Sequence, residues 1–211
     1  MNNNCPVKNI VFDIGMVLVD FRRHDYCRDL GLDEDTTMRL IKGITEHPLW
    51  NELDRGAVEY EDINRAFLES EPDMQKQAEL FWRDLTEIVR SFPQTKGWLA
   101  DLRSRGYNIY LLSNYPKKMF ELHCKTQFDF LEYVDGMVVS SYVGLVKPDR
   151  RIYELLLSKY NLVASQCVFL DDREENTEAA KRLGFKTVTV KDHVKAIGQL
   201  DELLSKYGER R

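Results

Sequence analysis

Six polar side chains in four short motifs have the chemistry needed to hold a metal ion and a phosphate group. The motifs are FDIG at 12–15, LLSN at 111–114, VKPD at 146–149 and FLDDREEN at 169–176. They supply the carboxylates of Asp13, Asp171 and Asp172, the hydroxyl of Ser113, the amide of Asn114 and the ammonium of Lys147. Clustered carboxylates repel one another unless a hard cation such as Mg²⁺ binds them, and a lysine and a hydroxyl are donors for phosphate oxygens. The pattern favours phosphoryl transfer, in which an aspartate oxygen attacks phosphorus.

The elements that must position these side chains are short apolar runs, each of which ends at a polar residue. Residues 8–13 predict a strand buried on both faces. After Pro93, strands alternate with helices of ordinary length, which predicts βαβ units and an α/β fold with a Rossmann-like parallel sheet. The strands are expected at 107–114, 135–141, 166–172 and 185–190. Because ligands bind beyond the carboxyl ends of such strands, we expect the six side chains at one edge of the sheet.

The stretch between the first strand and the rest has a different texture. Residues 59–71 and 74–92 carry apolar side chains at three- and four-residue spacing, which predicts amphipathic helices. We expect no strand from about residue 22 to residue 92. This segment is too long for an ordinary loop, so the sequence predicts an all-helical cap domain at 21–92, inserted in an α/β core formed by 1–20 and 93–211.

Composition and charge restrict the classes of molecule that the chain is expected to bind. The chain has 211 residues and a formal net charge of −5, and its basic clusters are short, which argues against a nucleic-acid partner. No apolar run approaches the length of a membrane span, which is about 20 residues. The cysteines at 5, 27, 124 and 167 are widely spaced, as in reduced cytosolic proteins. We expect a cytoplasmic monomer or weak homodimer whose partner is a small phosphorylated molecule.

Each candidate also has a simpler structural interpretation. Asp172 and Glu175 have the spacing of a capping box for the helix that follows. Ser113 and Asn114 are common turn residues, and a lysine such as Lys147 is usually exposed. Asp13 is harder to explain in this way, because a carboxylate that ends a buried strand must be compensated. The arrangement of all six residues outweighs the separate alternatives.

Other chemistry-bearing residues carry weaker signals. The histidines lack the spacing of a zinc site, and no motif for dinucleotide or nucleoside triphosphate binding is present. We expect three tryptophan side chains to pack in the core or the cap rather than to form a cage around a ligand: Trp50, Trp82 and Trp98. Arg55, within a DRG triplet, is a candidate to reach the substrate from the cap, although a solvated or capping arginine is the commoner case.

The four motifs in this order resemble those of the phosphatases of the haloacid dehalogenase superfamily, and the helical insertion resembles their C1-type cap. Residues 47–63, HPLWNELDRGAVEYEDI, are similar to the cap of small sugar phosphatases, including the bacterial α-D-glucose-1-phosphatase subgroup. The resemblance implies that Asp13 is the catalytic nucleophile and a ligand of Mg²⁺, together with the backbone carbonyl of Gly15. It implies that Ser113, Asn114 and Lys147 bind phosphate, with Lys147 also holding the Asp13 carboxylate. Asp171 and Asp172 would complete the metal site, with Asp172 the preferred direct ligand.

Gly15 departs from the superfamily pattern. Most of these phosphatases have DxD as the first motif, and the second aspartate protonates the leaving group and activates water. Here a glycine stands in its place, which frees the backbone but provides no proton. Loss of general acid–base assistance costs about 10²–10⁴-fold in rate.

Three explanations are open for this departure. The substrate has a good leaving group, such as a sugar anomeric oxygen in a hexose 1-phosphate. Another residue (Asp20, His24 or Asp25) takes the role of the missing aspartate. Or the protein is a phosphosugar-binding or regulatory module with little turnover. Dehalogenation on the same fold is disfavoured because it needs no magnesium, whereas Asp171 and Asp172 suit a metal.

Overall fold

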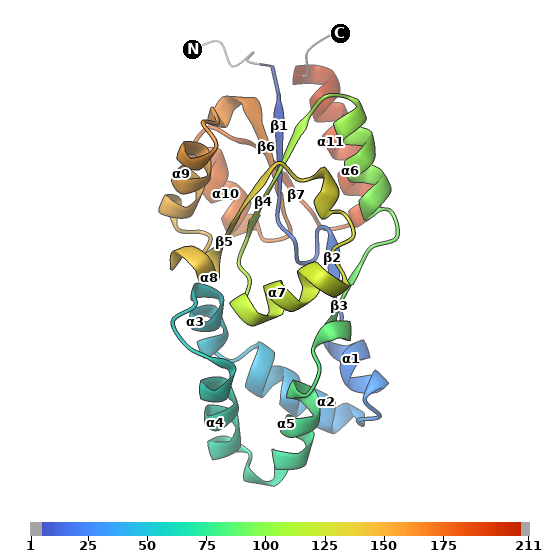
Figure 1. The fold of residues 1–211 in the computed structure, drawn as a ribbon, viewed down its shortest axis with the longest axis vertical. Helices are drawn as coiled ribbons and strands as arrows, with labels where there is room; N and C mark the ends of the chain where they lie inside the picture. The colour runs from blue at the N-terminus through green and yellow to red at the C-terminus, as the bar shows by residue number, and fades with distance from the viewer. Residues whose placement is uncertain (1–5, 208–211) are drawn as a thin grey trace.

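The computed structural model of the chain describes residues 6–207 and has a five-stranded parallel sheet at its centre (Figure 1). Its strands lie in the order β5-β4-β1-β6-β7. They are β1 Asn9–Phe12, β4 Asn108–Ser113, β5 Gly136–Val139, β6 Cys167–Asp171 and β7 Lys186–Thr189. Every neighbouring pair is parallel. The predicted α/β fold class is confirmed, and β1 lies between β4 and β6, so the residues that follow these strands are neighbours.

Helices cover both faces of the sheet because side chains of alternate strand residues point to opposite sides. Phe12 of β1 packs in one cluster with Trp98, and the two rings meet edge to face at 5.0 Å. Val11 packs on the other face, in a separate cluster with Tyr153. The helices of the Phe12 face are α6 Thr95–Ser104 and α11 His193–Tyr207, and those of the Val11 face are α9 Arg150–Lys159 and α10 Glu174–Arg182 (Figure 1).

The remaining helices lie toward the carboxyl ends of the strands and beyond them. α7 Lys117–Thr126 and the short α8 Ser140–Val143 lie between the sheet and a group of helices at the opposite end from the N-terminus (Figure 1). That group comprises α1 Arg23–Asp29, α2 Glu34–Leu40, α3 Leu49–Arg55, α4 Tyr60–Ser70 and α5 Gln75–Trp82. Its apolar side chains join the hydrophobic cluster of the Phe12 face.

The helix predicted over 74–92 is wrong in its second half. α5 ends at Trp82, and Asp84 Oδ1 then accepts a hydrogen bond from the Thr86 backbone N–H, at 2.9 Å. A side chain that captures a nearby backbone donor in this way competes with the helix. The apolar residues up to Ile88 that fit a helical spacing therefore belong to two elements. These are α5 and a short 3₁₀ turn, Thr86–Ile88.

A strand follows that turn, which the sequence did not predict. β3 Val89–Ser91 pairs antiparallel with β2 Val19–Phe21. The two strands form a ribbon in which Phe21 lies opposite Val89, so the chain enters and leaves the helical group at adjacent points. Within residues 6–207, no helix is both long and apolar enough to cross a membrane. The predicted domain boundaries, 21–92 and the two flanking segments, stay a prediction.

Candidate active site

The carboxyl edge of the sheet brings the predicted carboxylates and lysine together. Oxygen atoms of Asp13, Asp171 and Asp172 lie within 4.8 Å of one another. Lys147 Nζ lies 2.8 Å from Asp13 Oδ1 and 2.7 Å from Asp171 Oδ2. The order of the strands explains this meeting, because Asp13 follows the central β1 and Asp171 ends its neighbour β6. Asp13 therefore lies beside Asp171 and Asp172, as the sequence predicted.

Asp13 has one carboxylate oxygen fully engaged and one without a donor. Oδ1 accepts hydrogen bonds from the backbone N–H of Ile14 (2.7 Å) and from Ser113 Oγ (2.7 Å), in addition to its ion pair with Lys147. Among the described residues, no donor bonds to Oδ2. Burial raises the pKa of Asp13 to about 7; Lys147 opposes this rise, and the Asp171 and Asp172 carboxylates add to it. The site therefore holds more negative charge than its single lysine compensates.

Lys147 is held in place through its backbone by the Asn114 side chain. The Lys147 N–H donates to Asn114 Oδ1 at 2.8 Å, and Asn114 Nδ2 donates to the Lys147 carbonyl at 3.0 Å. Lys147 is 3% exposed, so an exposed surface lysine is the wrong interpretation. Both polar atoms of the Asn114 side-chain amide are thus occupied. If Asn114 binds phosphate, its backbone N–H is the group that does so. The phosphate-binding roles of Ser113, Asn114 and Lys147 stay predictions.

Asp171 and Asp172 differ in how many donors they already have. Asp171 is fully buried; its Oδ1 accepts from the Arg173 N–H and from Asn176 Nδ2, both at 2.9 Å, and its Oδ2 accepts from Lys147. The Asp172 carboxylate accepts no hydrogen bond from another described residue, and its pKa is raised by burial and by Asp171. The capping box is wrong as an explanation, because α10 starts after Arg173 without a side-chain cap. Asp172 is thus the carboxylate left available to a cation.

The donor set fits Mg²⁺. Asp13, Gly15 and Asp172 line one cavity of about 210 Å³. They offer carboxylate oxygens and a backbone carbonyl, which are the hard oxygen ligands that Mg²⁺ takes. Burial and neighbouring carboxylates raise the pKa of Asp13 and of Asp172, and a bound divalent cation would offset both effects. The assignment of individual metal ligands stays a prediction.

Helix α3 contributes one wall of the cavity. Trp50 and Asp54 of this helix line the cavity, together with apolar side chains that include Phe21, Tyr115 and Met119. Trp50 does pack, against Phe21 at a ring separation of 6.1 Å, but it also forms a wall of the site.

Arg55, the residue singled out in the DRG triplet, does not line the cavity. Its guanidinium pairs with Glu52 on the same helix, with Arg55 Nε 3.3 Å from Glu52 Oε2. The neighbouring Asp54 was missed. The signal that could have found it is the four-residue spacing from Trp50, which places both side chains on one face of a helix.

The residues considered as substitutes for the missing acid lie elsewhere. Within residues 6–207, the cavity lining contains none of Asp20, His24 and Asp25. His24 is exposed, and Asp25 Oδ1 pairs with Arg28 at 2.7 Å. A proton for the reaction must therefore come from another group.

Gly15 is not required by the backbone. A Cβ atom built at this position meets no atom within 4 Å, and the residue is not in the left-handed region. That conformation belongs to Met16, with φ of +57°. A larger side chain has room at this position.

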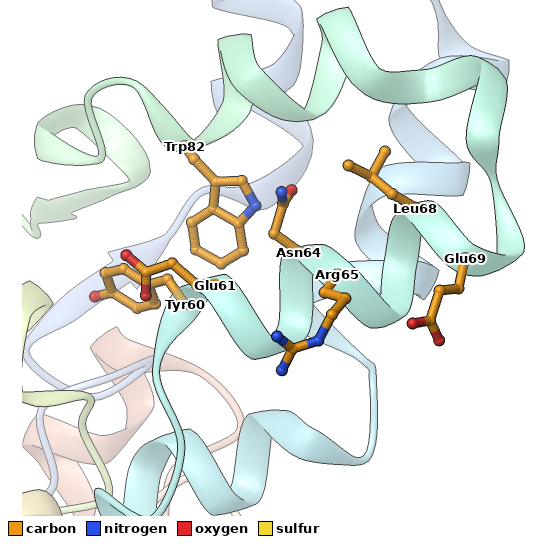
Figure 2. A pocket seen from close by; sticks show the side chains of 7 residues that line it. All are labelled: Tyr60, Glu61, Asn64, Arg65, Leu68, Glu69 and Trp82. Atoms are coloured by element: carbon orange, nitrogen blue, oxygen red, sulfur yellow. The ribbon is translucent and has the colours of Figure 1, made fainter.

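A second cavity, of about 590 Å³, lies on the helical group between α4 and α5 (Figure 2). Its walls include Trp82, which stacks on Tyr60 at a ring separation of 4.9 Å, and Asn64, which faces Trp82 from α4. None of the residues of the four motifs lines it. The cavity at the sheet edge is therefore the candidate active site.

Comparison with known proteins agrees with this geometry. Residues 7–184 match the family model of the haloacid dehalogenase-like hydrolases. The chain is 29% identical over 204 residues to a D-ribitol-5-phosphate phosphatase of Bacteroides thetaiotaomicron, covering 86% of this chain and 90% of the relative.

Two solved structures share the fold. One is a crystal structure of a family enzyme from the same organism in complex with magnesium and inorganic phosphate (TM-score 0.70, 21% identity, 88% of this chain and 94% of that one). The other is described as a dehalogenase (TM-score 0.71, 19% identity, 95% and 98%). At these identities the likeness shows the fold alone.

Proposed function

The chain belongs to the haloacid dehalogenase-like hydrolase family, and from this premise we propose that it is a Mg²⁺-dependent phosphatase of small phosphorylated metabolites. Its substrates would be phosphoric monoesters, with sugar phosphates such as hexose 1-phosphate as the first candidates. The observation that carries the proposal is the state of Asp13. Three donors hold its Oδ1, while Oδ2 is left to react in a cavity that also contains Lys147 and Asp172.

The proposed reaction begins with Asp13 as the nucleophile. Its carboxylate attacks phosphorus in line, the bond to the leaving oxygen breaks, and an aspartyl-phosphate forms. Lys147 fixes the Asp13 carboxylate and neutralises charge on the transferred group. Ser113 fixes the same carboxylate from β4. Asp13, Asp172 and the Gly15 carbonyl would hold Mg²⁺, which would supply further positive charge to the phosphate. Water then hydrolyses the intermediate.

The size and position of the cavity support a small substrate. A volume of about 210 Å³ accommodates a phosphate with a short carbon chain or a single sugar. The relative that hydrolyses D-ribitol 5-phosphate supports a polyol or sugar phosphate. The similarity of residues 47–63 to the glucose-1-phosphatase subgroup remains a prediction. So do the monomer or weak homodimer and the cytoplasmic location. Cys27, Cys124 and Cys167 are free thiols, as that location requires, and Cys5 lies outside the described residues.

The test is phosphate release by the purified protein. We expect release from p-nitrophenyl phosphate and from a panel of sugar and polyol phosphates with Mg²⁺, and none with EDTA. Asp13→Asn should abolish it, because an amide does not form the aspartyl-phosphate. Asp20→Asn, which changes a carboxylate outside the cavity, serves as the matched control. An Asp13→Asn variant as fast as the wild type would refute the proposal.

Gly15 favours a second candidate, a phosphosugar-binding module with little turnover. Its signature is tight binding of a sugar phosphate with no phosphate release across the panel. Dehalogenation is disfavoured by the clustered carboxylates of Asp13, Asp171 and Asp172, which suit a cation. Halide release without added metal would revive it.

A further inference from the structure

We propose that Asp54, on α3, is the general acid and base of this site and supplies the proton transfer for which position 15 has no side chain. The inference rests on the proposed phosphatase function and adds a catalytic residue to it. The sequence FDIG lacks the second carboxylate in the loop after β1. The fold brings a carboxylate to the same cavity from the helical group instead.

The location of Asp54 is the first step of the argument. Asp54 lines the cavity that Asp13, Lys147 and Asp172 also line. These three residues lie at the carboxyl edge of the sheet, whereas Asp54 comes from α3 in the helical group (Figure 1). In an in-line displacement, the nucleophile and the leaving oxygen lie on opposite sides of phosphorus. A carboxylate on the wall that α3 contributes is therefore suited to contact the leaving oxygen.

The end of α3 that carries Asp54 is seated firmly on the core. The Asp54 carbonyl accepts a hydrogen bond from Ser140 Oγ, and Ser140 Oγ accepts one from the Tyr115 N–H at 2.9 Å. Gly56 follows the helix with φ of +76°, and a Cβ there would lie 2.6 Å from the Ser141 carbonyl oxygen. This close approach leaves α3 little freedom to shift relative to α8. Asp54 is thus held as a proton donor must be.

The surroundings of the Asp54 carboxyl group are those of a group that holds a proton. No described residue makes a hydrogen bond or an ion pair with its side chain. The charged groups that affect its pKa are Asp13, Lys147 and Arg173, and Asp54 in turn raises the pKa values of Tyr60 and Tyr115. Burial, followed by the Asp13 carboxylate, raises the pKa of Asp54 to about 8 against the opposing effect of Lys147 and Arg173. These effects favour the protonated form of the group.

The proposed proton transfers balance over the two steps. As Asp13 attacks phosphorus and the ester P–O bond breaks, the Asp54 carboxyl gives its proton to the leaving oxygen, which departs as an alcohol. The Asp54 carboxylate then takes a proton from water as the water oxygen attacks phosphorus. The P–O bond to Asp13 breaks, and inorganic phosphate leaves. The site is restored with Asp54 protonated and Asp13 ionised.

Leaving-group dependence tests this role. Asp54→Asn should lower kcat/KM for an alkyl ester such as a sugar or polyol phosphate by about 10²–10⁴-fold, the usual value of general acid–base assistance. For p-nitrophenyl phosphate the fall should be under about tenfold, because its leaving group departs without a proton. With that ester, p-nitrophenol should also appear in a burst of one equivalent, since the aspartyl-phosphate then waits for an unassisted water.

Two further variants separate catalysis from structure. Glu52→Gln, on the same helix but outside the cavity, should leave both rates unchanged. Gly15→Asp fills open space in the loop after β1. Combined with Asp54→Asn, it should restore at least tenfold of the lost alkyl-ester activity, because the acid is returned to the same cavity.

The outcomes distinguish this inference from the function on which it rests. A wild type that releases no phosphate from either ester overturns both. An active wild type overturns the role of Asp54 alone if Asp54→Asn loses the same factor with both esters, or loses nothing with the alkyl ester. Unequal losses with a burst of p-nitrophenol support it.

Discussion

Removal of the Lys147 ammonium should destabilise the protein far more than loss of an ordinary ion pair. Lys147 lies between Asp13 and Asp171, at 2.8 Å and 2.7 Å, and its side chain is 1% exposed. Lys147→Met keeps most of the volume and leaves two buried carboxylates without their cation. Breaking a buried pair from one side costs about 3–5 kcal/mol. For a chain of this size that corresponds to a fall in Tm of about 6–20 °C.

The assay is urea unfolding of the metal-free protein, with Lys118→Met as the matched control. Lys118 also has a carboxylate partner at 2.8 Å, Glu59, but both side chains are more than half exposed. Such surface pairs contribute about 0–1 kcal/mol. The same substitution at the same bond length therefore isolates the effect of burial. A loss at Lys147 no larger than that at Lys118 would refute the reasoning.

The pH dependence of this loss has a definite sign. Lys147 lowers the pKa of Asp13, so its removal raises that pKa further. In the variant, the folded protein then binds more protons than the unfolded chain from about pH 4 to above the wild-type pKa of about 7, and its stability falls as the pH rises through that range. The difference between Lys147→Met and wild type should thus be smaller at pH 5 than at pH 8. An equal difference at both values would contradict the assignment of Asp13 as the coupled group.

Two further outcomes are expected. Mg²⁺ should raise the Tm more at pH 8 than at pH 5.5, because the raised pKa values of Asp13 and Asp172 let protons compete with the metal at the lower pH; an equal rise at both would contradict metal binding by these groups. Gly56→Ala should cost well over 1 kcal/mol, because it adds a contact of 2.6 Å with the Ser141 carbonyl to the strain of a positive φ. Gly144→Ala has similar strain and open space, so equal losses would show that the Ser141 contact is loose.

The sheet and the ends of its strands were predictable because their signals are local. A buried parallel strand is a short apolar run, and the residue at its carboxyl end faces the ligand side whatever follows later in the chain. Asp13, Ser113 and Asp171 could therefore be placed at one edge before any contact was known. The role of Asn114, the neighbour of Ser113 in sequence, could not be predicted in this way. Its amide binds the backbone of Lys147, which lies more than thirty residues away.

Asp54 and β3 were not predictable from local pattern. Asp54 enters the cavity because α3 rests on α8, through contacts with Ser140 and Ser141 that lie far along the chain. β3 exists because Val89 finds a partner in Phe21, also at long range. The apolar residues before it fit a helical period equally well. Sequence spacing identifies the face of an element, whereas tertiary packing decides what that face meets.

The ribbon of β2 and β3 affects how the helical group between these strands can be removed or exchanged. Because Phe21 and Val89 are paired, the chain enters and leaves the helical group at two adjacent backbone positions. A tight two-residue turn can close the same ribbon, so a chain without the group needs no change in the sheet. Exchange of one helical group for another is then a single modular event. If Asp54 acts as proposed, that event replaces the proton donor together with the substrate-contacting wall, and leaving-group chemistry and specificity are inherited as one unit.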